Sequence, residues 1–111
     1  MGTFVKRDVI VFPFPYSDFS GERRRPALVL ADLKGNDIIA CMITGQEKED
    51  NYSIELHKSD YADNRTLEND TCYIRPNRLI TIDTCVVLYC TARINQSKYD
   101  EVIEKIIEII R

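Results

Sequence analysis

The stretch that decides the fold runs from residue 8 to residue 30 and reads DVIVFPFPYSDFSGERRRPALVL. Its first segment, Val9–Phe12, is apolar and β-branched, which is typical of a buried strand. We expect this strand to end at residues 13–15, Pro-Phe-Pro, because proline has no N–H to donate to a β-ladder. After a polar loop that contains a glycine, a second strand starts at Pro26 and continues through Ala27–Ala31. This second strand is apolar throughout, so we expect it to be central in a sheet.

The chain beyond this unit continues as strands separated by turns. Residues 52–56 alternate apolar with polar side chains, the mark of a strand with one solvated face. Residues 57–69 form a long polar connection with little to bury. Further strands are expected at Ile38–Ile43, Cys72–Ile74, Leu79–Ile82 and Val86–Cys90.

The last fifteen or so residues have helical periodicity instead. Ser97 is the expected N-cap, with acidic residues in the first turn where the helix dipole favours them. Glu101 and Lys105 have the i,i+4 spacing of an exposed ion pair. One apolar stripe is formed by Ile103, Ile106, Ile107 and Ile110. We expect this helix to close a small barrel or to contribute to a dimer.

The size and composition limit the class of protein. A chain of 111 residues has room for one core, so we expect a single domain over residues 1–111. No apolar run approaches the roughly 20 residues of a membrane-spanning helix. Lys6, Arg7 and Asp8 interrupt any hydrophobic segment of a signal peptide. We therefore expect a cytoplasmic protein that does not contact a membrane.

The four cysteines do not indicate a metal site. None of them forms a Cys-x-x-Cys pair, and each lies in an apolar stretch, which is typical of buried free thiols. A zinc site made of His57, Cys85 and Cys90 would not have the spacing of a known structural zinc pattern. We expect neither a metal nor another cofactor.

The charge distribution is uneven along the chain. A formal net charge of −3 argues weakly against nucleic-acid binding. However, acidic residues gather in the segment 47–70, whereas three arginines stand together at positions 23–25. An acidic protein can still present one basic face. Charge alone fits a solvated arginine run as well as a phosphate-binding surface.

Three motifs together indicate a family. They are the unit from residue 8 to residue 30, the segment CMITGQ at 41–46 and the segment RLITID at 78–83. In their order and spacing they resemble the PemK/MazF toxin endoribonucleases (mRNA interferases) of type II toxin–antitoxin systems. The resemblance covers nearly the whole chain. It departs at Arg7, where many relatives have glycine before the first-strand aspartate.

The resemblance implies a mainly β fold, a small SH3-like or CcdB/PemK-type barrel closed by a C-terminal helix. It implies a homodimer whose RNA groove is blocked by a cognate antitoxin. The family's active-site arginine falls on Arg25, immediately before Pro26, and its active-site threonine falls on Thr44. The loop of residues 14–22 corresponds to the segment that helps to form the RNA groove.

These residue types suit metal-independent cleavage of single-stranded RNA, in which a 2′-hydroxyl attacks the neighbouring phosphate. Arg25 supplies a permanently charged planar fork for the transition state, and the Thr44 hydroxyl can donate to a phosphate oxygen or orient the 2′-hydroxyl. Candidates for the general base are Glu22 and Asp18 in the loop, with Asp83 further along the chain, and the sequence leaves the choice open. A pair of catalytic histidines within one protomer is excluded, because the chain has one histidine.

Other residues are expected to bind the RNA, by stacking on its bases or by contacting its backbone. They are Phe14, Tyr16, Ser17, Asp18, Arg24, Gln46, Arg78 and Thr81. The predicted activity is sequence-specific cleavage that leaves a 2′,3′-cyclic phosphate and a 5′-hydroxyl. Two alternatives stay open: a non-catalytic SH3-like module that binds nucleic acid or protein, and a gyrase-directed toxin of the same fold.

Overall fold

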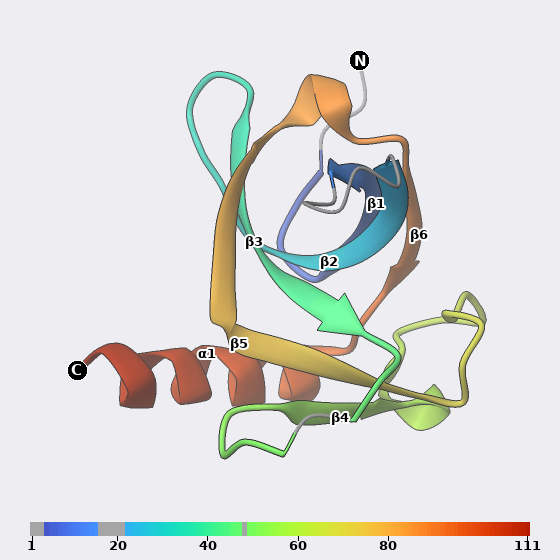
Figure 1. Ribbon diagram of the computed structural model, residues 1–111, viewed down its shortest axis with the longest axis vertical. Helices are drawn as coiled ribbons and strands as arrows, with labels where there is room; N and C mark the ends of the chain where they lie inside the picture. Colours follow the sequence, from blue (N-terminus) through green and yellow to red (C-terminus); the bar gives the residue numbers. More distant parts are fainter. Residues whose placement is uncertain (1–3, 16–21, 48) are drawn as a thin grey trace.

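The computed structural model describes residues 4–15, 22–47 and 49–111. In this part of the chain six antiparallel strands form one curled sheet in the order β4-β5-β3-β2-β1-β6, and a helix follows the last strand (Figure 1). The strands are β1 (Asp8–Pro15), β2 (Glu22–Asp32), β3 (Asp37–Thr44), β4 (Ile54–His57), β5 (Thr71–Asp83) and β6 (Tyr89–Arg93). The helices are α1 (Gln96–Ile110) and two short 3-10 turns, η1 (Lys58–Asp60) and η2 (Thr84–Val86).

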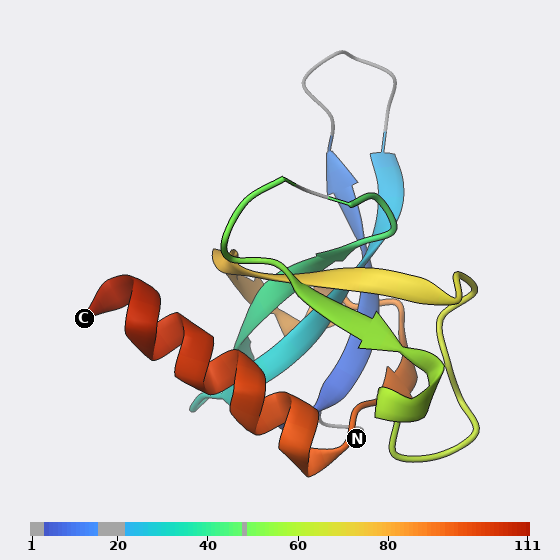
Figure 2. The same cartoon turned by 90° about the horizontal axis from the view of Figure 1, so that it is seen from below.

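The sheet closes on itself next to the start of α1. Tyr61 forms an isolated bridge with Ile94, and the Ala62 amide donates to the Arg93 carbonyl at 2.7 Å. The Asn95 amide donates in turn to the Asp60 carbonyl at 2.8 Å. These bonds join the end of β6 to the segment after β4, and α1 lies across one end of the curled sheet (Figure 2). The expected mainly β fold with a closing C-terminal helix is confirmed.

The first strand is longer than expected, because both prolines belong to it. Pro13 pairs with Arg24 and Pro15 pairs with Glu22. The Val11 carbonyl accepts the Leu88 amide, so the backbone groups of Val11 face β6. The backbone nitrogens of Pro13 and Pro15 face the same side, because backbone groups alternate in direction along a strand. β6 does not extend past Tyr89, opposite Val11, and the prolines therefore interrupt no ladder.

The second strand begins at Glu22 rather than at Pro26, so all three arginines at 23–25 lie within β2. Likewise, the two segments expected at 72–74 and 79–82 belong to one strand, β5. The register shifts between Cys41↔Leu79 and Met42↔Arg75, and the buried Pro76 lies in the interrupted part. A proline accommodated at a bulge explains why the sequence pattern breaks while the strand continues.

The C-terminal elements also begin at other residues than expected. β6 starts at Tyr89 instead of Val86, because residues 84–86 form η2. Asn95, not Ser97, caps α1: its side chain accepts the Lys98 amide at 2.8 Å. Lys105 pairs with Glu108 rather than with Glu101, whose carboxylate lies 3.1 Å from Lys98.

The core has two parts. One lies between the sheet and α1 and includes Val9, Leu28, Ile43 and Val102, while the other lies within the curl around Ile10 and Val29. The helix contributes Tyr99, Val102 and Ile106 as its buried residues. Of the expected isoleucine stripe, Ile106 is buried and Ile103 is partly buried, but Ile107 and Ile110 are exposed. The buried face is therefore centred nearer the N-terminal half of the helix.

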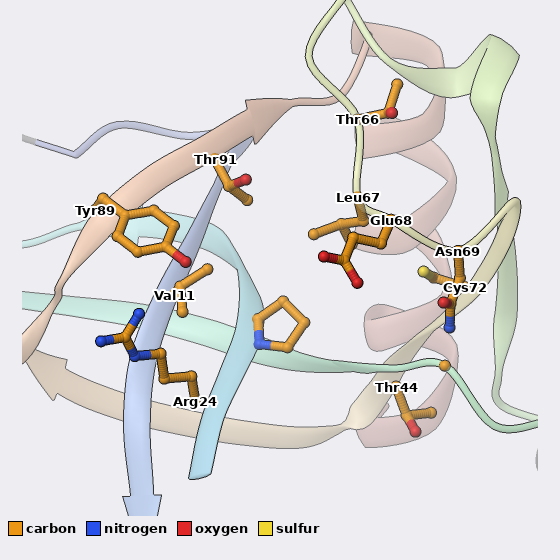
Figure 3. A pocket seen from close by; sticks show the side chains of 12 residues that line it. Val11, Arg24, Thr44, Thr66, Leu67, Glu68, Asn69, Cys72, Tyr89 and Thr91 are labelled. Atoms are coloured by element: carbon orange, nitrogen blue, oxygen red, sulfur yellow. The ribbon is translucent and has the colours of Figure 1, made fainter.

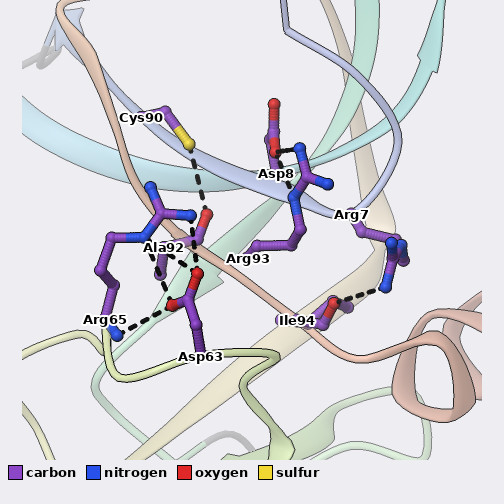
Figure 4. Close-up of polar contacts among 8 residues, drawn as sticks. All are labelled: Arg7, Asp8, Asp63, Arg65, Cys90, Ala92, Arg93 and Ile94. Atoms are coloured by element: carbon purple, nitrogen blue, oxygen red, sulfur yellow. Dashed lines mark hydrogen bonds and ion pairs between the residues drawn. The ribbon is translucent and has the colours of Figure 1, made fainter.

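A buried ion pair holds the start of β1 against β6 (Figure 4). The Asp8 carboxylate accepts from Arg93 at 2.8 and 3.0 Å, and it also accepts the Val5 amide at 3.0 Å. Arg7 precedes this aspartate with φ of +81°, in the left-handed region that favours glycine. This explains in backbone terms why a glycine suits the position.

Candidate functional site

The start of β2, the end of β3 and the middle of β5 surround a hollow of about 360 Å³. We call it the arginine hollow, because four of its side chains are arginines. Its lining consists of Phe14, Arg23, Arg25, Met42, Ile43, Thr44, Gly45, Gln46, Arg75 and Arg78. None of these lining residues is acidic, so the hollow is cationic although the whole chain carries a net negative charge.

Strand alternation decides which arginines enter this hollow. Successive side chains of a strand point to opposite faces, so Arg23 and Arg25 share one face of β2 and Arg24 lies on the other. Ala27 pairs with Met42, and extending this antiparallel register by two residues brings Arg25 opposite Thr44. Both side chains line the arginine hollow. Arg25 and Thr44, two of the three predicted catalytic residues, are thus brought together.

The Thr44 hydroxyl is held at the end of β3. Its oxygen accepts the Gln46 amide at 3.2 Å, which closes a short turn around Gly45. A hydroxyl that accepts this bond keeps its own hydrogen for donation. Thr44 can therefore donate to an anion in the hollow while its orientation is fixed by the turn.

Arg75 is a site residue that the sequence analysis did not select. Its guanidinium lies 3.1 Å from the Asp50 carboxylate, with both side chains about four-fifths buried. Asp50 also accepts the Tyr52 and Ser53 amides at 3.0 and 2.9 Å, and these bonds lower its pKa to about 2. Asp50 therefore stays ionised and anchors Arg75 at the wall of the hollow. An Arg-Pro pair at 75–76, like that at 25–26, was the one available signal.

A second hollow of about 420 Å³ lies on the other face of β2 (Figure 3). We call it the Glu68 hollow, after the acidic side chain that points into it. Its lining consists of Val11, Arg24, Pro26, Thr44, Gly45, Thr66, Leu67, Glu68, Asn69, Cys72, Tyr89 and Thr91. Thr44 and Gly45 line both hollows, so the two are adjacent at the end of β3.

The remaining predicted residues fall into three groups. Phe14, Gln46 and Arg78 line the arginine hollow, and Arg24 lines the Glu68 hollow. Thr81 is exposed on β5 opposite Ile39 and lines neither hollow. Three predicted residues lie outside the described part of the chain: Tyr16, Ser17 and Asp18.

Candidate bases are not assembled at the hollow by the described side chains. Glu22 begins β2, but its side chain is outside the described part. Asp83 lies at the far end of β5, opposite Asp37, where it accepts the Cys85 amide at 2.9 Å. This bond lowers the pKa of Asp83 and ties the carboxylate to the start of η2.

The described residues contain no group of three or more His, Cys, Asp or Glu side chains that could hold a metal ion. His57, Cys85 and Cys90 are therefore not brought together. Cys41 and Cys72 are buried, and burial raises the pKa of the Cys41 thiol to about 12, so this cysteine stays protonated. Cys85 is exposed and Cys90 is half-buried, which differs from the expectation that all four are buried. No helix in the described part is long and apolar enough to cross a membrane.

Comparisons with known proteins agree on the fold. The chain resembles the MazF structure in a MazE–MazF complex from Deinococcus radiodurans, with a TM-score of 0.76, 17% identity and coverage of 98% of this chain and 97% of that one. An endoribonuclease in complex with its cognate antitoxin, from a mycobacterial species, gives a TM-score of 0.72, 10% identity and coverage of 96% and 93%. The Mycobacterium tuberculosis toxin MazF-mt6 gives a TM-score of 0.67 and 14% identity, with coverage of 90% of this chain and 92% of that one.

At the sequence level, a search of curated proteins gave no match. Residues 6–110 match the model of a protein family, the PemK-like, MazF-like toxins of type II toxin–antitoxin systems. The match includes both hollows and every strand of the curled sheet. The chain belongs to this toxin family.

Proposed function

We propose that this toxin is a sequence-specific endoribonuclease that cuts single-stranded RNA without a metal ion. The observation that carries the proposal is the meeting of Arg25 and Thr44 in a hollow lined by four arginines. Solved structures of the same fold include an endoribonuclease with its cognate antitoxin, which supports the same reaction class here.

The arginine hollow suits the backbone phosphate of RNA. Guanidinium groups bind phosphate oxygens through two parallel N–H donors, and several of them in one hollow attract a polyanion. Arg75 is already oriented by Asp50, so its side chain loses less conformational entropy when a phosphate binds. Phe14, at the rim, packs edge-on against Phe12 with ring centroids 6.1 Å apart and can offer its face to an unpaired base.

The chemistry assigned to the site is an internal transesterification. The 2′-oxygen loses its proton and attacks the adjacent phosphorus, and the bond from phosphorus to the 5′-oxygen breaks. The products are a 2′,3′-cyclic phosphate and a 5′-hydroxyl, the latter formed when the leaving oxygen gains a proton. Arg25 stabilises the charge that builds on the phosphorane-like transition state, and Thr44 donates to a non-bridging oxygen. We assign the role of general base to Glu22.

The partners follow from the same surface. A cognate antitoxin that presents acidic side chains would neutralise the arginine hollow and exclude RNA from it. We further propose that the protein works in the cytoplasm as a homodimer, in which α1 is one candidate for the contact because Ile107 and Ile110 are exposed.

The test is cleavage of a long single-stranded RNA in EDTA, with mapped ends. The wild type should give discrete cuts with 5′-hydroxyl ends. Arg25→Ala and Thr44→Ala should each lower the rate by about 100-fold or more, the usual effect of losing a transition-state donor. Arg111→Ala, which removes the same charge at the end of α1, should cut like the wild type.

Other outcomes separate the alternatives. A folded, antitoxin-free wild type that binds RNA without cutting it would support the non-catalytic binding module. Inhibition of gyrase supercoiling without RNA cleavage would support the gyrase-directed toxin. Cleavage that requires an added divalent cation would contradict the metal-independent mechanism.

A further inference from the structure

The Glu68 hollow has the chemistry of a base-binding pocket rather than of a second phosphate site. Figure 3 shows Leu67 and Glu68 on one side of the hollow, Tyr89, Val11 and Thr91 on the other, and Arg24 at its edge. We propose that this hollow is a subsite for one nucleobase beside the scissile phosphate, and that Glu68 selects guanine there. This inference rests on the proposed ribonuclease function, which it deepens by naming a specificity residue.

The position of the hollow supports the first part of the proposal. Thr44 and Gly45 line both hollows, with Arg25 facing one and Arg24 facing the other across β2. An RNA whose phosphate lies at Arg25 and Thr44 therefore has a neighbouring base within reach of the Glu68 hollow. A side chain at residue 45 would clash with the Asn69 amide, so glycine at this position leaves room for Asn69 at the Glu68 hollow.

The lining fits a flat ring with a polar edge. Val11, Pro26 and Leu67 provide apolar surface, and the side chain of Tyr89 is 46% exposed, so part of its ring is open to stacking. The volume of about 420 Å³ lies within the roughly 300–1,000 Å³ typical of small-molecule sites. Arg24 at the edge can contact the phosphate on the far side of the bound nucleotide.

The carboxylate determines which base is preferred. An ionised glutamate only accepts hydrogen bonds, through two oxygens side by side. Guanine presents two adjacent donors on its Watson–Crick edge, the N1–H and the N2 amino group, and so matches both oxygens at once. Adenine and cytosine each offer one amino group beside an acceptor nitrogen, and uracil places its single N–H between two carbonyl oxygens that repel a carboxylate. The order of preference is therefore guanine first and uracil last.

Glu68 is available for this role. Its carboxylate takes part in none of the ion pairs formed among residues 4–15, 22–47 and 49–111, although it lies in a hollow that also contains Arg24. By contrast, the nearby Asp63 is bound by Arg65 at 2.9 Å. Glu68 is exposed, so its carboxylate is accessible to a ligand.

The experiment measures binding of short single-stranded 2′-fluoro RNAs, which lack the attacking hydroxyl and cannot be cut by the proposed mechanism. The probes are a uridine hexamer and the same hexamer with one guanosine, adenosine or cytidine. Wild type should bind the guanosine probe most tightly, and Glu68→Gln should reduce the preference for guanosine over uridine by about 5- to 100-fold. Affinity for the uridine hexamer should rise, because Glu68→Gln removes the carboxylate that repels the uracil carbonyl oxygens.

Two controls accompany this variant. Glu104→Gln removes the same charge from an exposed position on α1, outside both hollows, and should keep the preference. Tyr89→Leu should weaken every probe by a similar factor, because stacking does not depend on base identity. Mapped cleavage of a long RNA by the wild type runs in parallel and tests the ribonuclease function separately.

The outcomes are distinguishable. Equal base preferences in the wild type and Glu68→Gln would overturn the subsite even if the wild type cuts RNA, and would be expected if the hollow holds a side chain of a protein partner. A preference that depends on Glu68, without cleavage, would support the subsite while contradicting the ribonuclease. No binding of any probe and no cleavage would overturn both.

Discussion

At the scale of single residues, the site depends on which face of a strand an arginine occupies. Arg25 and Arg24 are adjacent in the chain, yet they line different hollows because side chains alternate along β2. The same alternation places Arg25 with Thr44. A shift of β2 by one residue would exchange the two arginines and leave the threonine without its partner.

Arg7 gives a residue-scale prediction. Its φ of +81° costs an L-residue about 1–2 kcal/mol, of which glycine's extra unfolded-state entropy offsets about half. Arg7→Gly should therefore raise the free energy of unfolding by about 0.5–1 kcal/mol, despite losing the 3.4 Å bond to the Ile94 carbonyl. Arg7→Ala loses the same bond and keeps the strain, so it should not stabilise. Urea unfolding of the three proteins compares them, and equal stabilities of the two variants would refute the strain argument.

At the scale of elements, the two arginines of β5 reach the arginine hollow because the strand continues past Pro76. Only its pairing with β3 is interrupted there. The register shift opposite Cys41 and Met42 lets β5 pair with β3 on both sides of Pro76. Arg75 and Arg78 thereby line one hollow although they lie on either side of the proline. The bulge thus changes the direction of the side chains so that both arginines line the hollow, as bulges near functional sites commonly do.

The start of α1 gives an element-scale prediction. The Asn95 side chain accepts the Lys98 amide at 2.8 Å, whereas Ser97 only donates to Asn95 at 3.1 Å. Asn95→Ala should therefore lower the free energy of unfolding by about 1 kcal/mol, and Ser97→Ala by only a few tenths. Thermal unfolding of both variants gives the comparison. A larger loss for Ser97→Ala would show that the helix is capped as the sequence alone suggested.

At the scale of the whole molecule, charge is separated into regions. The chain is acidic overall, but no acidic side chain among the described residues lines the arginine hollow. Asp50, from the acidic middle segment, enters the site only as the anchor of Arg75. A cationic surface on an acidic protein attracts RNA locally, and the attraction should weaken as salt screens it.

Asp50 also gives a prediction about acid stability. Its folded pKa of about 2 lies below the usual value near 3.8, so its contribution to stability is fully present above pH 4 and is lost as pH falls toward 2. Acid unfolding of Asp50→Asn should consequently depend less on pH between 4 and 2 than that of the wild type. Asp70→Asn, at an exposed position, is the matched control and should keep the wild-type slope.

The sequence by itself determined the fold class and the central strands, and its resemblance to a known family supplied Arg25 and Thr44 as residues proposed for catalysis. The fold class and the strands depend on local patterns: apolar runs at strand length and turn residues between them. The expectations that proved wrong also rested on local patterns. Pro13 and Pro15 do not end the first strand as expected, because a proline is tolerated wherever its missing N–H would face no neighbouring strand.

Only the tertiary structure decided how the site is assembled. Arg75 is anchored by Asp50, 25 residues earlier in the chain. Glu68 and Tyr89 come from distant segments and line the same hollow. The side of β2 on which each arginine lies was likewise fixed by pairing with β1 and β3. Such contacts depend on strand register and on closure of the sheet, which sum interactions over the whole chain and leave no signature within any short stretch of it.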